Sequence, residues 1–265
     1  MLTALITVVG KRRIEATQEL VKSLKNTDKS VRAAAFKSLG TTVPPQSLDV
    51  LISQVVAPSN SDDLDFAKQA LKTAAVRMPD REVCAAQLAK TMGTSELPTK
   101  VVLLDIIGAV GGTSALETIY TAAKGNTPEL RDVSSRVLGE WLTYDAAPVL
   151  LDLVKTGPSD KFQGRLFKGY LRMAGQFARN PSERVAMCNE AFAAARQVGE
   201  QKSVLELIKK FPDVETLKMA IKATEIAELK ADAIQTALVI AEKTKGNAEE
   251  VQKLLKEAGI AAPKS

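Results

Sequence analysis

Apolar residues recur along the chain at helical spacing, in segments that end at Gly, Pro or Asn. The clearest segment runs from Asp28 to Gly40, DKSVRAAAFKSLG. Four of its apolar residues fall on one helical face (Val31, Ala34, Ala35 and Leu39). Asp28 suits the N-cap position, because its carboxylate can accept hydrogen bonds from free first-turn amides. Gly40 suits a C-terminal stop. This pattern predicts a helix over 31–40.

Similar segments recur and are separated by partner helices. They start at Val31, Phe66, Val102, Leu130, Leu166, Val204 and Leu229, about 33 residues apart on average, which suits a two-helix unit. The partner helices are expected at Ile14–Lys25, Ser47–Val56, Glu82–Met92, Ser114–Ala123, Ala146–Lys155, Ser182–Val198, Val214–Ala223 and Ala248–Ala258. Turn residues mark the breaks, as at Pro44-Pro45, Gly157-Pro158 and Gly246-Asn247. No strand alternation of useful length is present, so the pattern predicts an all-α fold of helical hairpins.

Two of these segments resemble a known repeat family. The D-x-x-V-R-x-A-A-x-x-x-L-G pattern of Asp28–Gly40 and the LRDVSSRVLGEW of Leu130–Trp141 resemble the second helix of a HEAT repeat. The resemblance covers nearly the whole chain. It implies a right-handed α-α superhelix, or solenoid, of about seven HEAT-like hairpins over residues 1–260, with a frayed tail at 261–265.

The two ends of the chain refine this expectation. The apolar stretch Leu2–Gly10 reads as a helix of a partial repeat, which is consistent with a fragment of a larger protein. The C-terminal half, with the LFKGYLR of Leu166–Arg172 and the later Ala241-Glu242-Lys243, also resembles HEAT-like regions of large multidomain bacterial proteins. No apolar run reaches the roughly 18 residues of a membrane span, so we expect no transmembrane helix.

Composition lowers the expectation of catalysis. The chain contains no histidine, which removes the usual general base and the usual zinc ligand. The two cysteines, Cys84 and Cys188, lie among Ala and Val in helical stretches, as small buried hydrophobes do. We therefore expect a protein that is not an enzyme and that holds no metal or cofactor. The net charge of +5 permits an anionic partner without requiring one.

A column of basic residues is the main candidate binding site. The seventh positions of the recurring helices are Lys37, Lys72, Gly108, Arg136, Arg172, Lys210 and Gln235. In HEAT proteins the second helices line the concave face, so the resemblance places this column along a groove. Two further lysines precede basic members at i, i+4 spacing, whereas Asp132 and Glu206 are expected to pair with their own neighbours. The candidate partner-binding residues are Lys68, Lys72, Arg136, Lys168, Arg172 and Lys210.

Each candidate also has a structural interpretation. Long basic side chains can cover apolar surface while their charged ends stay in water. Trp141, the single tryptophan, can seal a hairpin or anchor a partner, and Tyr170 can fill space between helices or contact a ligand. Gly111-Gly112 lacks a surrounding phosphate-binding pattern, so we interpret it as a turn between helices.

Three functions remain in competition. The first is a non-catalytic protein-interaction scaffold that binds a partner on the concave surface of the solenoid. The alternative is a nucleic-acid binder similar to HEAT-like DNA glycosylases, which use a basic concave groove. A lyase or chaperone-like HEAT protein is the third, but no set of residues identifies it.

Overall fold

A computed structural model describes residues 1–157, 161–244 and 248–261. The chain divides into two compact units, Met1–Val137 and Leu138–Ser265. All regular structure in the described residues is helical, with no strand, so the prediction of an all-α fold is confirmed. The turns predicted at Gly157-Pro158 and Gly246-Asn247 lie wholly or partly outside the described residues. So does the predicted tail, apart from Ala261.

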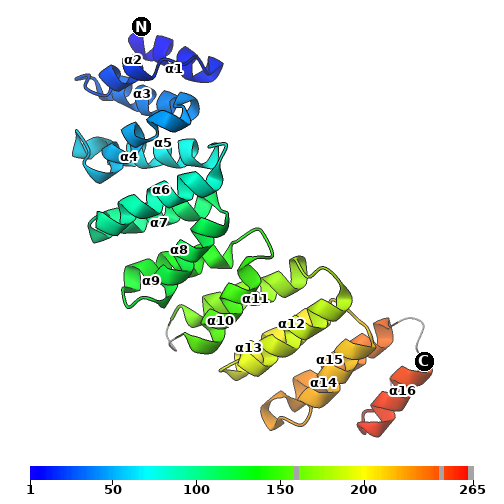
Figure 1. Ribbon diagram of the computed structural model, residues 1–265. Coiled ribbons are helices and arrows are strands. Elements are labelled where there is room, and N and C mark those ends of the chain that lie inside the picture. Colours follow the sequence, from blue (N-terminus) through cyan, green and yellow to red (C-terminus); the bar gives the residue numbers. More distant parts are fainter. Residues whose placement is uncertain (158–160, 245–247, 262–265) are drawn as a thin grey trace. The chain divides into compact units, whose positions relative to one another are not determined.

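The first unit is built from helices that pack on their neighbours in chain order (Figure 1). They are α1 (Leu2–Arg12), α2 (Thr17–Ser23), α3 (Lys29–Thr42), α4 (Asp49–Val56), α5 (Leu64–Val76), α6 (Arg81–Thr94), α7 (Leu97–Val110), α8 (Thr113–Lys124) and α9 (Pro128–Gly139), whose last residues belong to the second unit. Helix α1 packs on α3, α3 on α5, and α5 on α7, while α6 packs on both α7 and α8. Helices that alternate in sequence thus lie side by side in one row.

The second unit repeats this arrangement. Its helices are α10 (Ala146–Thr156), α11 (Gln163–Gln176), α12 (Pro181–Ala194), α13 (Val198–Ile208), α14 (Val214–Ala223), α15 (Lys230–Lys243) and α16 (Ala248–Glu257). One row contains α11, α13 and α15, and the other contains α10, α12, α14 and α16. Three short 3-10 helices, Pro45–Ser47, Ser61–Asp63 and Ala227–Leu229, lie in the connections of the two units.

Polar side chains begin several of these helices. The carboxylate of Asp28 accepts from the amide of Ser30 at 2.8 Å, as the sequence predicts. Asp80 caps α6 and Asn180 caps α12 in the same way, by accepting from Val83 and Glu183. Asp213 and Thr216 form a reciprocal capping box at the start of α14. Each cap satisfies a backbone donor that the helix itself cannot use.

Two predicted boundaries are wrong. Gly40 does not stop its helix, because α3 continues to Thr42 and ends where Val43 takes an extended conformation before Pro44. Gly40 instead lies against α5, where a Cβ atom would come within 3.1 Å of the Ala70 backbone. The helix predicted over Ser182–Val198 ends at Ala194, and α13 begins at Val198.

Candidate functional site: the α5–α7–α9 groove

Three of the six predicted site residues line one groove of the first unit. This α5–α7–α9 groove has a volume of about 510 Å³. Its walls are Asp65, Lys68, Gln69 and Lys72 of α5, Val101, Val102, Asp105 and Ile106 of α7, and Val133 and Arg136 of α9. Lys68 and Lys72 reach it together because residues four apart share one helical face.

A single carboxylate organises the cations of this groove. The Nζ of Lys72 lies 2.9 Å from Oδ2 of Asp105, and the Nη2 of Arg136 lies 2.7 Å from its Oδ1. Burial acts to raise the pKa of Asp105, but the hydrogen bonds from Lys72 and Arg136 outweigh it and lower the pKa overall. Asp105 is therefore ionised at neutral pH and holds both cations in place.

The charges of the groove do not cancel. Lys68 forms an ion pair with Asp65, with its Nζ 3.3 Å from Oδ1, so three cations face two carboxylates. All these pairs keep access to water, and exposed ion pairs are weak. The half-buried Val101 and Val102 supply apolar surface beside them. The groove can therefore accept a carboxylate or phosphate together with an aliphatic side chain.

The other predicted residues lie in the second unit. Arg172 and Lys210 line a smaller groove of about 310 Å³ between α11 and α13. The guanidinium of Arg172 donates to the carbonyl oxygens of Gly139, at 2.8 Å, and Trp141. Lys210 is exposed, and the carboxylate predicted to pair with it, Glu206, instead forms an ion pair with Lys209. Lys168 is exposed on α11.

The two aromatic candidates are buried. Trp141 is 5% exposed, and its Nε1 donates to Thr143 Oγ1 at 2.9 Å and to Asp145 Oδ1 at 3.0 Å. This environment matches the structural interpretation, a side chain that seals the connection after α9. Tyr170 is also buried, and burial raises the pKa of its hydroxyl.

Gly111 and Gly112 form the predicted turn between α7 and α8. Both residues have positive φ values, 71° and 91°. The carboxylate of Glu82, on α6, accepts from the amides of Thr113 and Ser114, each at 2.8 Å. These hydrogen bonds lower the pKa of Glu82, with the amide of Ser114 contributing most. The carboxylate of Glu82 therefore occupies the N-terminal end of α8, the position where a helix could otherwise bind an external anion.

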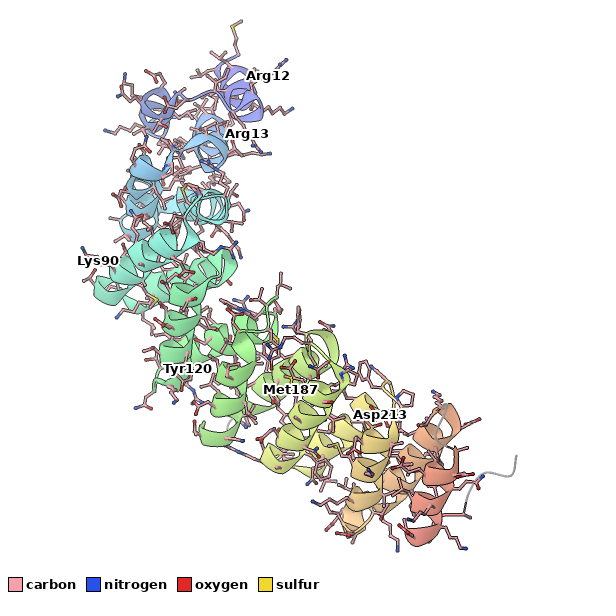
Figure 2. The ribbon with its side chains drawn as sticks, turned by 45° about the vertical axis from the view of Figure 1, so that its right-hand side comes forward. Arg12, Arg13, Lys90, Tyr120, Met187 and Asp213 are labelled. Carbon is pink, nitrogen blue, oxygen red and sulfur yellow. The ribbon has the colours of Figure 1, made fainter. Side chains whose placement is uncertain are left out.

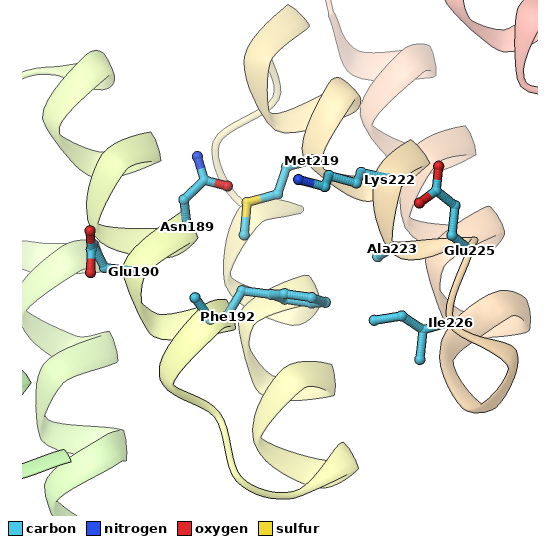
Figure 3. A pocket seen from close by; sticks show the side chains of 9 residues that line it. Asn189, Glu190, Phe192, Met219, Lys222, Ala223, Glu225 and Ile226 are labelled. Carbon is cyan, nitrogen blue, oxygen red and sulfur yellow. The ribbon is translucent and has the colours of Figure 1, made fainter. Parts of the chain in front are cut away.

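One groove of the second unit was not predicted from the sequence. The α12–α14 groove has a volume of about 630 Å³, and Phe192, Met219 and Ile226 form its apolar part (Figure 3). Lys222 and Asn189 lie beside Met219 at its edge. Phe192 follows the buried Ala191 and widens the apolar face of α12. This wider apolar face is the feature of the sequence that could have indicated the groove. This groove can accept an apolar side chain.

Both cysteine thiols lie in the interior of the protein. Cys84 and Cys188 are unpaired and buried, and burial raises their thiol pKa values to about 11 and about 12. Neither thiol is therefore an activated nucleophile. Within the described residues, no three His, Cys, Asp or Glu side chains gather in a way that could hold a metal ion. The helices described also include none that is long and apolar enough to cross a membrane.

Comparisons with known proteins give no family for this chain. No family model matches it, and no curated protein matches it. Among solved structures, the chain is similar to the crystal structure of an engineered protein from the Northeast Structural Genomics Consortium. The two share 16% sequence identity, over 97% of this chain and 74% of that one, with a TM-score of 0.41.

Proposed function

We propose that this chain is a HEAT-type solenoid that acts as a non-catalytic scaffold and binds an anionic protein partner in the α5–α7–α9 groove. The row formed by α1, α3, α5 and α7 supports the repeat interpretation, because solenoid repeats contact mainly their neighbours. Such rows present surfaces to which several helices contribute. Binding along such a surface needs no catalytic group.

The observation that carries the proposal is the arrangement around Asp105. Its carboxylate bridges Lys72 and Arg136, which come from the two helices on either side of α7. Bridging brings the two cations together at the groove, where their combined charge exceeds that of the one carboxylate that pairs with both. Lys68 adds a cation one helical turn away. An acidic residue of a partner gains from these charges, and a neighbouring aliphatic residue gains from Val101 and Val102.

The composition of the groove favours protein over nucleic acid. Single-stranded nucleic acid is bound by basic grooves with aromatic side chains on which bases stack. The residues that line this groove include no aromatic one, and two of them are acidic. A phosphate backbone would meet Asp65 and Asp105 as well as the cations. A partner with isolated carboxylates and aliphatic side chains fits better.

Direct binding assays separate the two functions. The probe is a fluorescein-labelled peptide in which Glu and Leu are interspersed, and the comparison probe is a DNA duplex of equal net charge. We expect the peptide to bind with an affinity that falls as salt rises. Tighter binding of the duplex, or no binding of the peptide at low salt, would contradict the proposal. Turnover of any probe would contradict its non-catalytic part.

A further inference from the structure

Helix α1 carries the largest concentration of exposed apolar side chains in the described residues. Leu2, Leu5 and Val8 are 46%, 62% and 49% exposed. Leu5 and Val8 lie on the side of α1 away from Ile6 and Gly10, which are buried, whereas Leu2 lies one turn before Ile6, at the edge of the buried side. The other large apolar residues that are exposed lie mostly apart from one another on different helices, such as Val56 on α4 and Val83 on α6. Contiguous exposed apolar surface of this kind marks binding sites.

The exposed positions of α1 follow the spacing of a helix-packing face. Residues 1, 4, 5, 8, 11 and 12 are all exposed, which is the i, i+3, i+4, i+7 pattern that helices use against each other. We call Ala4, Leu5, Val8, Lys11 and Arg12 the α1 outer face. The opposite side of α1 is fixed on α3, since the hydroxyl of Ser38 donates to the carbonyl of Ile6 at 2.8 Å.

The charge of the α1 outer face has one sign. Lys11, Arg12 and Arg13 follow one another at the end of the helix, and all three are exposed; Figure 2 shows Arg12 and Arg13 there. Helix α1 contains no acidic residue. A partner that covers Leu5 and Val8 therefore also meets Lys11 and Arg12, and acidic residues in the partner would complement them.

We propose that the α1 outer face binds an amphipathic α-helix of a partner protein, with an apolar stripe and acidic residues beside the basic end of α1. This surface lies outside the α5–α7–α9 groove. The helical spacing of the exposed positions favours a helix over a flat anionic lipid surface.

A second copy of this chain complements the face poorly. If two α1 helices packed in parallel, their basic clusters would meet. If they packed antiparallel, each cluster would meet the positively polarised N-terminal end of the other helix. An acidic helix from another protein avoids both repulsions.

The test uses the full chain and a labelled synthetic peptide of about 20 residues, long enough to form a helix. Its Leu residues follow helix-packing spacing and its flanking residues are Glu; a matched peptide has Lys in place of every Glu. We expect the acidic peptide to bind at least about tenfold more tightly than the lysine peptide.

Variants locate the binding surface. Leu5→Glu and Arg12→Glu should each lower the affinity of the protein for the acidic peptide by about tenfold. Val83→Glu, at a residue that is 63% exposed on α6, is the matched control and should keep the affinity. Thermal melting by circular dichroism verifies that each variant is folded.

Four outcomes would overturn the inference. These are equal binding of the two peptides, unchanged binding by Leu5→Glu, and loss of binding in Val83→Glu alone. The fourth is evidence that lipid or a second copy of the chain covers this face instead. Such evidence would be sedimentation of the protein with phosphatidylserine vesicles, or a dimer in analytical ultracentrifugation, if Leu5→Glu abolished it.

Discussion

At the scale of single residues, charged side chains fix the connections between helices. Glu183 shows this best: its carboxylate accepts from the hydroxyl of Tyr144 at 2.9 Å and from the guanidinium of Arg179 at 2.6 Å. It also accepts from the backbone amide of Arg179 at 2.6 Å. These interactions, with the Arg179 side chain contributing most, lower the pKa of Glu183 to about 2. One carboxylate therefore joins the start of α12 to the segment that precedes α10.

The depressed pKa of Glu183 predicts a pH-dependent stability. In the unfolded chain the carboxyl titrates near its ordinary pKa of 4.5, so its contribution is fully present above about pH 5 and disappears as pH falls toward about 2. We expect Glu183→Gln to be less stable than the wild type at pH 6, with a difference that shrinks on acidification. Urea unfolding between these pH values measures it. Glu249→Gln, at an exposed carboxylate of α16, is the control, and an equal pH dependence in both variants would refute the assignment.

Gly112 gives a second prediction at this scale. Its φ of 91° is costly for any residue with a Cβ atom, and that atom would lie 2.3 Å from Oε1 of Glu82. Gly112→Ala should therefore destabilise the protein by about 1–3 kcal/mol. A Cβ atom at Gly93, inside α6, meets nothing within 4 Å, so Gly93→Ala should be neutral or stabilising by up to about 1 kcal/mol. Chemical denaturation of both variants tests the contrast, and equal effects would show that the turn imposes no strain.

At the scale of helices, arginines from one helix satisfy the last carbonyl groups of another. Arg77 of the α5 C-terminus donates to Gly40 and Val43 at the end of α3. Arg172 of α11 does the same at the end of α9. Arg196, after α12, donates to the carbonyls of residues 154, 155 and 157 at the end of α10. Helices α3 and α5, and likewise α10 and α12, are neighbours in one row, so the arginines between them tie successive hairpins together.

This role predicts a stability effect for Arg172. Replacement by Met keeps the aliphatic part of the side chain but leaves the carbonyls of Gly139 and Trp141 without their donor. Arg172→Met should cost about 1–3 kcal/mol. Lys168→Met, at an exposed position one turn earlier on the same helix, should change stability by less than about 0.5 kcal/mol. Urea unfolding of the two variants compares them, and a similar loss in both would mean that charge, and not the carbonyl contacts, matters.

The sequence predicts helices better than it predicts what their side chains contact. Asp28 and Pro44 act locally, so the start of α3 and the break after it follow from propensity alone. Helical register also brought Lys72 and Arg136 to one groove. The carboxylate between them, Asp105, belongs to a third helix, and its role depends on how α5, α7 and α9 pack. Arg172 was predicted as a binding residue for the same reason: the carbonyls that it contacts are some thirty residues away in the chain.

At the scale of the molecule, the described residues contain several open surfaces. In the first unit, the α5–α7–α9 groove combines partly neutralised cations with half-buried valines, and the α1 outer face combines cations with exposed apolar residues. The second unit contributes the apolar α12–α14 groove. Open surfaces of this kind suit binding to extended or helical segments, which agrees with the proposed scaffold.

The proposed scaffold function depends most directly on the cations held by Asp105. The decisive measurement is the affinity of the acidic Glu/Leu peptide at low salt, by fluorescence anisotropy, for the wild type and three variants. The double variant Lys72→Gln/Arg136→Gln removes the two cations that Asp105 holds. Asp105→Asn keeps both cations and removes the carboxylate that neutralises them. Lys90→Gln, at an exposed lysine on α6 outside the groove (Figure 2), is the control.

The account predicts opposite changes in affinity. The double variant should bind the peptide about tenfold more weakly, Asp105→Asn should bind it several-fold more tightly, and Lys90→Gln should match the wild type. Equal affinities for all four folded proteins, or weaker binding by Asp105→Asn, would contradict the assignment of this groove as the partner-binding site.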